Sequence, residues 1–436
     1  MAGPLRAMGG GDRVPQGGGP GGGPGRPGGL RGAIPFRRDQ LRALGLVAPL
    51  LIFVGVTFIA PLATMLTRSV HDPVVADALP ETLALLRDWD GDGLPAEAVY
   101  ETAARELERL GEERTIGQVA GRVNRVQGGL RSVFTRTVRE LADAAPDPAV
   151  AAETPWRDAL AGIDPAWADP MTWHAVRTTG ERFTSRHYLN AVDRERLPDG
   201  TIARQPEERR IYLRLFWRTL LVSGTITVLC LLLGYPIAHL IARAPPRRAA
   251  LLLVLVLVPF WTSLLVRTTS WIVLLQTQGV INDLLVAIGL VSDDGRLAMV
   301  YNMTGTIIAM THVLLPFMVL PLYSVMRGIP PQYMSAAASL GATPVQAFLR
   351  VYWPQSLPGV GAGALLVFIL SIGFYITPAL VGGSDGQLIS NMIAYHMQTS
   401  LNWGLAGALG GILLVGVLAL YLVYDRLVGV ERMGLS

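Results

Sequence analysis

The stretch that decides the fold runs from Ile329 to Val360 and reads IPPQYMSAAASLGATPVQAFLRVYWPQSLPGV. It lies between two long apolar runs and is punctuated by glycine and proline. Pro331 suits the first turn of a helix, and the alanines 336–338 have high helix propensity. Gly341 stands where a glycine commonly ends a helix. The first half of the stretch therefore predicts a short helix that stops at Gly341.

The second half of the stretch predicts another helix, so that the two form an elbow, by which we mean residues 329–359. Thr343 is suited to cap this helix, with Pro344 at its first position and Gln346 at the spacing of a capping box. Pro354 and Pro358 are expected to end it before the next apolar run. A loop between membrane spans needs no such caps, so the elbow is predicted to contact another protein.

The elbow resembles the cytoplasmic EAA motif of the permease subunits of binding-protein-dependent ABC importers, through the pattern S-A-A-A-S-L-G-A-T-x-x-x-x-F-x-x-V-Y-W-P-x-x-x-P-G. In that family the motif docks into a groove of the ATPase subunit. The resemblance implies ATPase coupling by the following positions: Ser335, Ala336, Ala337, Ser339, Gly341, Ala342, Phe348, Arg350 and Pro354. The family usually has Glu where this chain has Ser335, and an acidic residue near Ser339, so the charged contact with the ATPase stays open. The alternative is an ordinary capped loop whose alanines serve helix propensity alone.

The composition is that of a membrane protein without nucleotide chemistry of its own. Of 436 residues, 51% are hydrophobic and 16% are charged, whereas soluble domains average about 25% charged residues. All 37 basic residues are arginine, which excludes a P-loop and a Schiff-base lysine. The single cysteine, Cys230, excludes an intrachain disulfide. Any ATP and Mg²⁺ must therefore be bound by partner subunits, and the net charge of +4 needs no nucleic acid to explain it.

Six apolar runs are long enough to cross a bilayer as helices. They are residues 43–65, 216–242, 251–275, 301–326, 360–381 and 403–424. Arginines flank one set of their ends, at Arg243, Arg247, Arg248, Arg327, Arg350, Arg426 and Arg432. The loops 276–300 and 382–402 carry only Arg296 between them. The positive-inside rule then places both termini and the elbow in the cytoplasm. A cleaved signal peptide is the alternative for the first run.

These runs predict the domain organisation. Residues 1–40 form a Gly/Pro/Arg tail that is expected to be disordered, and residues 41–66 form the first span. Residues 67–210 hold 25 of the 33 acidic residues and are predicted to be a periplasmic helical insert. Residues 211–430 are the transmembrane core. Within the insert, residues 96–110 and 117–141 each predict one amphipathic helix. The insert either binds a solute-binding protein or caps the permease.

One segment of the insert is a possible metal site. Asp88, Asp90 and Asp92 resemble the start of a calcium loop, but Val99 occupies the position of the bidentate glutamate. A solvated turn is the competing interpretation. His239 and His312 stand alone in different spans and are expected to pack rather than to bind metal.

Several aromatic, proline and polar positions of the core could line a translocation path, because prolines in spans free backbone groups that a wet cavity can satisfy. The candidates are Tyr235, Phe260, Trp261, Arg267, Asp283, Tyr375 and Thr377. Arg267 is expected near the outer end of a span, and Asp283 in a semi-apolar outer loop that could dip back into the membrane. Close packing between spans is the alternative use of all these residues.

The segments PFWTSLLVRTTSWIVLL, TPALVGG and TSLNWGLAGALGGILL are similar to the spermidine/putrescine branch of these permeases. The resemblance implies an all-α polytopic protein of the bacterial inner membrane with a type I ABC importer permease core. It further implies a second permease subunit in a heterodimer, two ATP-binding subunits and a periplasmic solute-binding protein. The solute that this branch implies is a polyamine, spermidine or putrescine, or a similar small organic cation. No Asp or Glu lies in the predicted spans, which argues against an intramembrane polycation site and assigns selectivity to the binding protein or the partner permease. Opines, amino-acid derivatives, iron and sulfate are the alternative solutes. A membrane-anchored receptor and a secondary transporter are the contrasting hypotheses.

Overall fold

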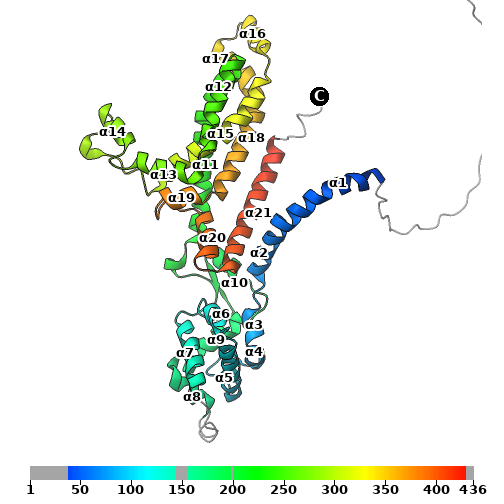
Figure 1. Ribbon diagram of the computed structural model, residues 1–436, viewed down its shortest axis with the longest axis vertical. Helices are drawn as coiled ribbons and strands as arrows, with labels where there is room; N and C mark the ends of the chain where they lie inside the picture. The colour runs from blue at the N-terminus through cyan, green and yellow to red at the C-terminus, as the bar shows by residue number, and fades with distance from the viewer. Residues whose placement is uncertain (1–37, 144–154, 198–199, 429–436) are drawn as a thin grey trace, which may run out of the picture. The chain divides into compact units, whose positions relative to one another are not determined.

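The computed structural model describes residues 38–143, 155–197 and 200–428 (Figure 1). The predicted tail lies outside these residues up to position 37. Chain contacts separate residues 1–59 from residues 60–436. The first unit contains helix α1, Arg38–Val54, which continues as a π-helical turn, Gly55–Ile59. Its apolar side chains, such as Leu50, Phe53 and Phe58, are exposed, as lipid-facing side chains are.

Six helices of the described residues are long and apolar enough to cross a membrane. They are Gly45–Val70, Tyr212–Arg243, Leu264–Ala287, Met303–Arg327, Pro344–Gly373 and Trp403–Arg426. The predicted all-α polytopic fold with six spans is therefore confirmed. Two of the six, Leu264–Ala287 and Pro344–Gly373, begin and end at other residues than the predicted runs 251–275 and 360–381.

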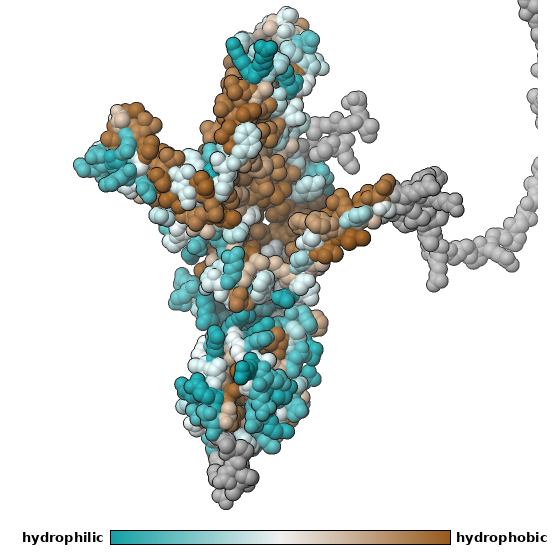
Figure 2. All heavy atoms as spheres, in the orientation of Figure 1, coloured by the Kyte–Doolittle hydropathy of each residue, from teal (hydrophilic) through white to brown (hydrophobic). Residues whose placement is uncertain are grey.

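A helical insert follows α2, Ala60–Val70. Its helices are α3 Val74–Ala78, α4 Pro80–Arg87, α5 Glu97–Glu112, α6 Ile116–Val123, α7 Leu130–Asp143, α8 Trp156–Ile163, α9 Pro170–Thr179 and α10 Arg186–Ala191. The surface of this region is mostly hydrophilic, in contrast to the apolar surface of the spans (Figure 2). The predicted helix 96–110 is confirmed as α5.

The prediction of one continuous helix over residues 117–141 is wrong, because the chain breaks between α6 and α7. Gly129 adopts φ +96, which a helix does not tolerate. The side-chain oxygen of Asn124 accepts hydrogen bonds from the backbone N–H groups of Gly129 and Arg131, at 2.9 and 3.1 Å. This side chain thus ends one helix and caps the next.

The core of the insert is built on large aromatic side chains. Trp167, Trp173, Tyr100 and Phe134 are all at most 1% exposed. Trp167 Nε1 donates to Thr137 Oγ1 at 2.8 Å, and the Tyr100 hydroxyl donates to the Trp167 carbonyl at 3.1 Å. These bonds satisfy the polar ends of rings that are otherwise packed in apolar surroundings.

A two-stranded antiparallel hairpin, β1 Arg194–Arg196 and β2 Ile202–Arg204, connects the insert to the next span. The sequence did not lead us to expect it. Just before it, Asp193 adopts φ +56 and turns its carboxylate to the first turn of α11, Tyr212–Arg243. The two carboxylate oxygens accept from the backbone N–H groups of Tyr212 and Leu213, at 3.0 and 2.9 Å. An insert residue therefore caps the start of a membrane span.

The centre of the membrane region is a bundle of three long helices, α11, α15 Met303–Arg327 and α18 Trp353–Gly373 (Figure 1). A Cβ atom at Gly359 would lie 3.2 Å from the Pro321 carbonyl oxygen and the Leu322 Cα, and one at Gly363 would lie 2.7 Å from Met318 Sδ. Glycines four residues apart thus let α18 approach the backbone of α15, the usual contact between spans.

The prediction of a continuous span over residues 251–275 is wrong. The segment divides into α12 Pro246–Leu257, a 3₁₀ turn Val258–Trp261 and α13 Leu264–Leu275, and α14 Val280–Ala287 follows. Pro259 has no N–H to donate, and Thr262 and Ser263 are extended. The apolar span of this region is Leu264–Ala287, so Asp283, predicted for an outer loop, falls within it. The expectation that no acidic residue lies in a span is therefore wrong as well.

The predicted span 360–381 is likewise wrong in its bounds. Helix α18 ends at Gly373, Phe374 is extended, and a separate short helix, α19 Ile376–Val381, follows. The predicted outer loop 382–402 contains α20, Ile389–Gln398, before the last span α21, Trp403–Val428. Asn391 Nδ2 donates to the Tyr375 carbonyl at 2.8 Å, so α20 folds back onto the break between α18 and α19.

Candidate coupling elbow and translocation path

The first arm of the elbow is helix α16, Pro331–Ser339, and it ends as the sequence predicts. Gly341 adopts φ +85, a left-handed conformation that favours glycine. Its N–H donates to the Ala338 carbonyl, and the Ala342 N–H donates to the Ala337 carbonyl, both at 3.0 Å. This pair of bonds is the Schellman motif, which satisfies the last carbonyls of the helix.

The second arm begins at helix α17, Pro344–Ala347, with the predicted capping box. Gln346 N–H donates to Thr343 Oγ1 at 3.3 Å, and Thr343 N–H donates to Gln346 Oε1 at 3.1 Å. These reciprocal bonds fix where the second arm starts. The turn between the arms is thus set by Gly341 on one side and Thr343 on the other.

The prediction that Pro354 and Pro358 end the second arm is wrong. After α17 the chain makes a π-helical turn, Phe348–Tyr352, in which the Trp353 N–H reaches the Phe348 carbonyl, five residues back. The wider turn accommodates Pro354, which has no N–H to donate, and helix α18 continues through Pro358. The second arm and the span α18 are therefore one continuous helical rod, Pro344–Gly373.

An aromatic cluster holds the second arm to α11. The ring of Phe348 lies 6.1 Å from that of Tyr235 and 5.9 Å from that of His239, centroid to centroid. Tyr352 meets His239 edge to face at 4.8 Å, and the Arg243 guanidinium lies 5.1 Å above the Tyr352 ring. The packing role predicted for His239 is confirmed, and the elbow is braced against the end of a second span.

The residues predicted for ATPase coupling separate into two groups. Ala337 is buried, and Ala342 and Phe348 are partly buried, so these three hold the elbow together. The exposed members are Ser335, Ala336, Ser339, Gly341, Arg350 and Pro354. Ser339 Oγ donates to the Ser335 carbonyl at 3.0 Å, which is a local helix bond and leaves no charge at either position.

Sequence reasoning missed the exposed apolar residues of the elbow. Leu340 is 89% exposed, and Val345, Leu349 and Tyr333 are between 50% and 67% exposed. The coupling positions implied by the resemblance to the EAA motif are mostly small residues and do not include these four. The signal that could have found them is the presence of apolar side chains in a capped loop with polar edges. Such side chains on a rigid turn are the usual core of a protein–protein contact.

The candidate path residues do not gather at one place. Tyr235 belongs to the elbow cluster, where its hydroxyl lies 2.9 Å from Ser356 Oγ. Phe260 meets Phe317 edge to face at 5.0 Å, and Trp261 is 73% exposed. Tyr375 is 39% exposed and precedes α19. The role of these residues in a path stays a prediction.

Polar groups do converge where the third apolar segment breaks. The Arg267 guanidinium donates to the Pro259 carbonyl and to the Thr262 carbonyl, the latter at 3.0 Å. At the next residue, Thr268 Oγ1 lies 3.3 Å from Thr377 Oγ1, and both side chains are fully buried. Arg267 therefore adds side-chain hydrogen bonds to two backbone carbonyls of the proline break, and Thr377 ties α19 to α13.

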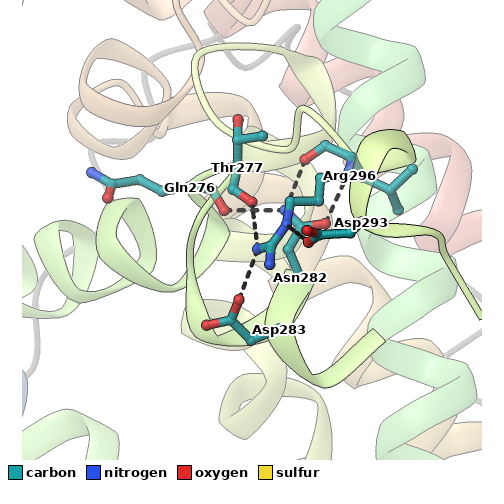
Figure 3. A network of polar contacts seen from close by, with 7 residues as sticks. Gln276, Thr277, Asn282, Asp283, Asp293 and Arg296 are labelled. Carbon is teal, nitrogen blue, oxygen red and sulfur yellow. Dashed lines mark hydrogen bonds and ion pairs between the residues drawn. The ribbon is translucent and has the colours of Figure 1, made fainter. Parts of the chain in front are cut away.

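Asp283 is engaged in an ion-pair network (Figure 3). Arg296 Nη1 lies 2.7 Å from Asp283 Oδ1, and Arg296 Nε lies 2.9 Å from Asp293 Oδ1. Asn282 Nδ2 donates to the carbonyls of Gln276 and Leu297, at 3.1 and 2.9 Å. The network closes the loop after α14 onto its start, and the single guanidinium of Arg296 is shared by the carboxylates of Asp283 and Asp293.

Two further predictions concern histidine and metal. His312 Nδ1 accepts from Trp271 Nε1 at 3.1 Å, as expected of a packing histidine. The described ranges hold no group of three or more His, Cys, Asp or Glu side chains placed to bind a metal ion, so the structure gives no support to calcium at Asp88, Asp90 and Asp92. A protein contact holds the turn, since Arg177 Nη1 donates to the Trp89 carbonyl at 2.9 Å.

Six apolar helices, a proline-broken polar region between them and a capped elbow continuous with a span define a polytopic membrane protein. Residues 218–429 match the model of the binding-protein-dependent transport system inner membrane component family. The spermidine/putrescine transport system permease protein PotB of Haemophilus influenzae is 37% identical over 216 residues, covering 50% of this chain and 75% of that protein. PotB of Escherichia coli is 34% identical over 216 residues, with 50% and 78% covered.

The chain belongs to this family, and it is the permease subunit of a type I ABC importer, a multi-pass protein of the inner membrane. The matched region begins within α11, so the insert and the first span lie outside it. A crystal structure of a bacterial ABC transporter involved in the import of the acidic polysaccharide alginate covers 53% of this chain and 82% of its own, at 20% identity and a TM-score of 0.39. That value is too low to add to the assignment.

Proposed function

We propose that this permease subunit carries a polyamine, spermidine or putrescine, or a similar small organic cation into the cytoplasm by alternating access. The solute arrives from a periplasmic solute-binding protein. The names of the two PotB relatives support this substrate class, and the family itself depends on a binding protein. The subunit performs no bond chemistry, and the free energy comes from ATP bound with Mg²⁺ on two partner ATP-binding subunits.

The observation that carries the proposal is the continuity of the elbow with a span. The second arm, from Pro344, and α18 form one rod that ends at Gly373. The rod packs closely against α15 through Gly359 and Gly363. An ATPase subunit that binds the exposed apolar side chains around Leu340 transmits the closure of the ATPase dimer directly to this rod. A flexible connection would absorb the same movement.

The orientation and assembly follow from the charges and from the family. Arginines at Arg243, Arg327 and Arg426, at the elbow ends of three spans, support a cytoplasmic elbow and cytoplasmic termini. The insert is then periplasmic, at the opposite ends of the spans. A second permease subunit, in a heterodimer, completes the translocation path.

Selection of the solute is expected to lie partly outside this chain. The carboxylate of Asp283 is paired with Arg296, which also pairs with Asp293. A cationic solute would therefore have to compete with Arg296 for this carboxylate. The binding protein and the second permease subunit therefore carry most of the recognition of the cation.

The coupling role is tested with Gly341→Asp in the assembled transporter, reconstituted in vesicles with its ATPase and binding protein. The variant is expected to lose transport and transport-stimulated ATP hydrolysis while the complex still inserts in the membrane. Gly93→Asp is the matched control, because Gly93 has φ +67 and, like Gly341, has no atom within 4 Å of the position that a Cβ would take, but lies in the insert. Equal coupling in both variants would refute the role of the elbow.

The substrate class is tested separately by uptake of labelled spermidine and putrescine into the same vesicles. Uptake that requires ATP and the binding protein supports the proposal. Uptake of neither polyamine, with ATP hydrolysis still stimulated by the loaded binding protein, would show an importer of another solute. This outcome would overturn the substrate and leave the coupling role standing.

A further inference from the structure

The insert and the membrane bundle meet around a cavity of about 410 Å³, which we call the arginine cavity. A volume of this order is typical of a small-molecule site. Its lining comes from the turn after α6, from α10, from the segment before α11 and from the start of α21. The residues that matter for its charge are Arg125, Arg186, Arg209 and His187.

The charges of this lining are one-sided. Three arginines line the cavity, and no carboxylate is among its lining residues. The Asp72 carboxylate, which lies near Arg186, is already paired with Arg122 at 2.8 Å. A smaller adjoining hollow of about 110 Å³ shares the three arginines but also contains Glu181 and Glu195. The excess positive charge is therefore greatest on the side of the larger cavity.

Two side chains of the cavity wall each have a buried donor that lacks an acceptor. Arg186 Nη1 and both ring nitrogens of His187 are buried without a hydrogen-bond partner among the described residues. The His187 side chain is only 2% exposed. Burial, and then the charge of Arg186, lowers the pKa of His187 to about 4, so the neutral ring offers one N–H donor at neutral pH. Buried donors without acceptors are costly and rare in folded proteins.

Two of the amide oxygens that line the cavity already accept hydrogen bonds. Gln205 Nε2 donates to Asn190 Oδ1 at 3.0 Å, and Arg125 Nη1 donates to Asn402 Oδ1 at 3.3 Å. Arg125 and Arg209 are exposed to solvent, whereas Arg186 is half-buried. Water could accept from the remaining donors, but it would not balance the charge of Arg186. An oxyanion does both, since arginine forms its strongest hydrogen bonds with carboxylate and phosphate oxygens.

We propose that the arginine cavity binds a small oxyanion, a phosphate or carboxylate group, which fastens the insert to the first turns of α11 and α21. The contacts on each side of the cavity support this role. Arg125 reaches from the insert to Asn402 and to the Leu401 carbonyl, at 3.1 Å for the latter. Tyr212 and Leu405, from the first turns of the two spans, complete the wall. An anion held here touches the insert and both spans at once.

Two sources can supply such a group. One is a free anion such as inorganic phosphate. The other is the phosphate of an acidic lipid, because the cavity lies where two membrane spans begin, at Tyr212 and Trp403. The chemistry is the same in both cases, and only the tethering of the phosphate to acyl chains differs.

The test uses the purified full-length chain in detergent, titrated with inorganic phosphate at constant ionic strength while its thermal unfolding is followed. The wild type is expected to show a saturable rise of the unfolding midpoint. Arg186→Gln is expected to weaken the apparent phosphate affinity by about tenfold or more, the effect of losing one charge-assisted hydrogen bond. Arg139→Gln is the matched control, since Arg139 is exposed on α7 and does not line the cavity.

Phosphate also stabilises proteins generally by exclusion from their surface, so the difference between variants decides the outcome. An equal response of wild type and Arg186→Gln would overturn the proposal. If Arg186→Gln fails to fold, Arg209→Gln serves in its place, because Arg209 is exposed and its replacement disturbs no packing.

The two sources are separated by repeating the measurement in nanodiscs. Stabilisation by phosphatidylglycerol over phosphatidylcholine, lost in the Arg186 and Arg209 variants, would identify a lipid headgroup. Stabilisation by inorganic phosphate in both lipids would identify a free anion. The absence of any variant-sensitive response to either probe would show that the cavity holds only water, contrary to the proposal.

Discussion

The insert and the three-helix bundle pack their interiors in different ways. The insert buries Trp167 and Trp173, each at most 1% exposed, and satisfies their indole N–H groups with side-chain and backbone oxygens. The bundle instead brings Gly359 and Gly363 of α18 against the backbone and methionine side chains of α15. Large aromatic rings fill the core of the insert. In the bundle, glycines without side chains let the helices come into close contact.

The difference follows from the two solvents. In water, burying an aromatic side chain contributes stability in proportion to the apolar area removed. In a bilayer, lipid is as apolar as the side chains, so association depends on close van der Waals contact at small residues. The two regions should therefore fail in opposite ways, the insert when a large side chain is removed and the bundle when a side chain is added.

The largest effect is expected from Trp173→Ala in the insert. Removal of a fully buried tryptophan creates a cavity and costs about 3–5 kcal/mol of unfolding free energy. Limited proteolysis of the insert against temperature would measure it. Trp217→Ala is the control, because Trp217 is 64% exposed on α11 and should change little. Equal sensitivity of the two variants would contradict the assignment of the insert core.

A pH dependence is expected at the junction of the two regions. Burial is the main cause that lowers the pKa of His187 from an ordinary 6.5 to about 4. The positive charges of Arg186, Arg125 and Arg122 lower this pKa further, and the Asp72 carboxylate raises it. Between pH 6.5 and 4, His187 takes up a proton in the unfolded chain but stays neutral in the folded chain. The free energy of unfolding should therefore fall as the pH drops through this range. The loss amounts to about 3 kcal/mol at about 1.4 kcal/mol for each pH unit.

His187→Asn should remove this part of the pH dependence. Unfolding midpoints of wild type and variant, measured at neutral pH and near pH 5, provide the comparison. The same slope in both proteins would show that His187 is not held neutral in the folded state.

In the bundle, Gly359→Leu should separate α18 from α15. Its Cβ would meet the Leu322 Cα and the Pro321 carbonyl oxygen at 3.2 Å, and backbone atoms cannot turn aside as a side chain can. Overpacking of this kind costs about 1–3 kcal/mol. Gly416→Leu on α21 is the matched control, since no atom lies within 4 Å of the position that its Cβ would take. Thermal unfolding in detergent should be lowered in the first variant only.

The smallest effect is expected at the elbow, from Thr343→Ala. Loss of the capping oxygen frees the Gln346 N–H and costs about 1 kcal/mol of local stability. Hydrogen exchange of the elbow amides should quicken while exchange in the bundle stays the same. Unchanged exchange around residue 343 would show that the capping box does not fix the second arm.

Features that depend on residues close together in the sequence were predictable. Gly341 and Thr343 specify the ends of two helices within a few residues, and hydropathy locates six spans because each must be apolar along its whole length. The resemblance to the permease family rested on the same local motif. The family assignment agrees with it.

Features set by distant residues were not predictable. The Asp193 carboxylate caps α11 from nineteen residues away, across the hairpin β1–β2. Each strand of this hairpin has only three residues, too few for a clear alternation of apolar and polar side chains in the sequence. The continuity of the second arm with α18 depends on a π-helical turn, whereas prolines alone indicate a helix end. The arginine cavity joins Arg125 to Asn402 across 277 positions, a pairing that no local pattern predicts.

The central claim is that the elbow is a cytoplasmic lever and that the insert lies across the membrane from it. The most direct test labels single introduced cysteines with a membrane-impermeant thiol reagent, because the native Cys230 is buried and gives no background. In right-side-out vesicles, Arg139→Cys in the insert should be labelled and Leu340→Cys should be protected until the membrane is permeabilised. Labelling of Leu340→Cys in sealed right-side-out vesicles would contradict the account.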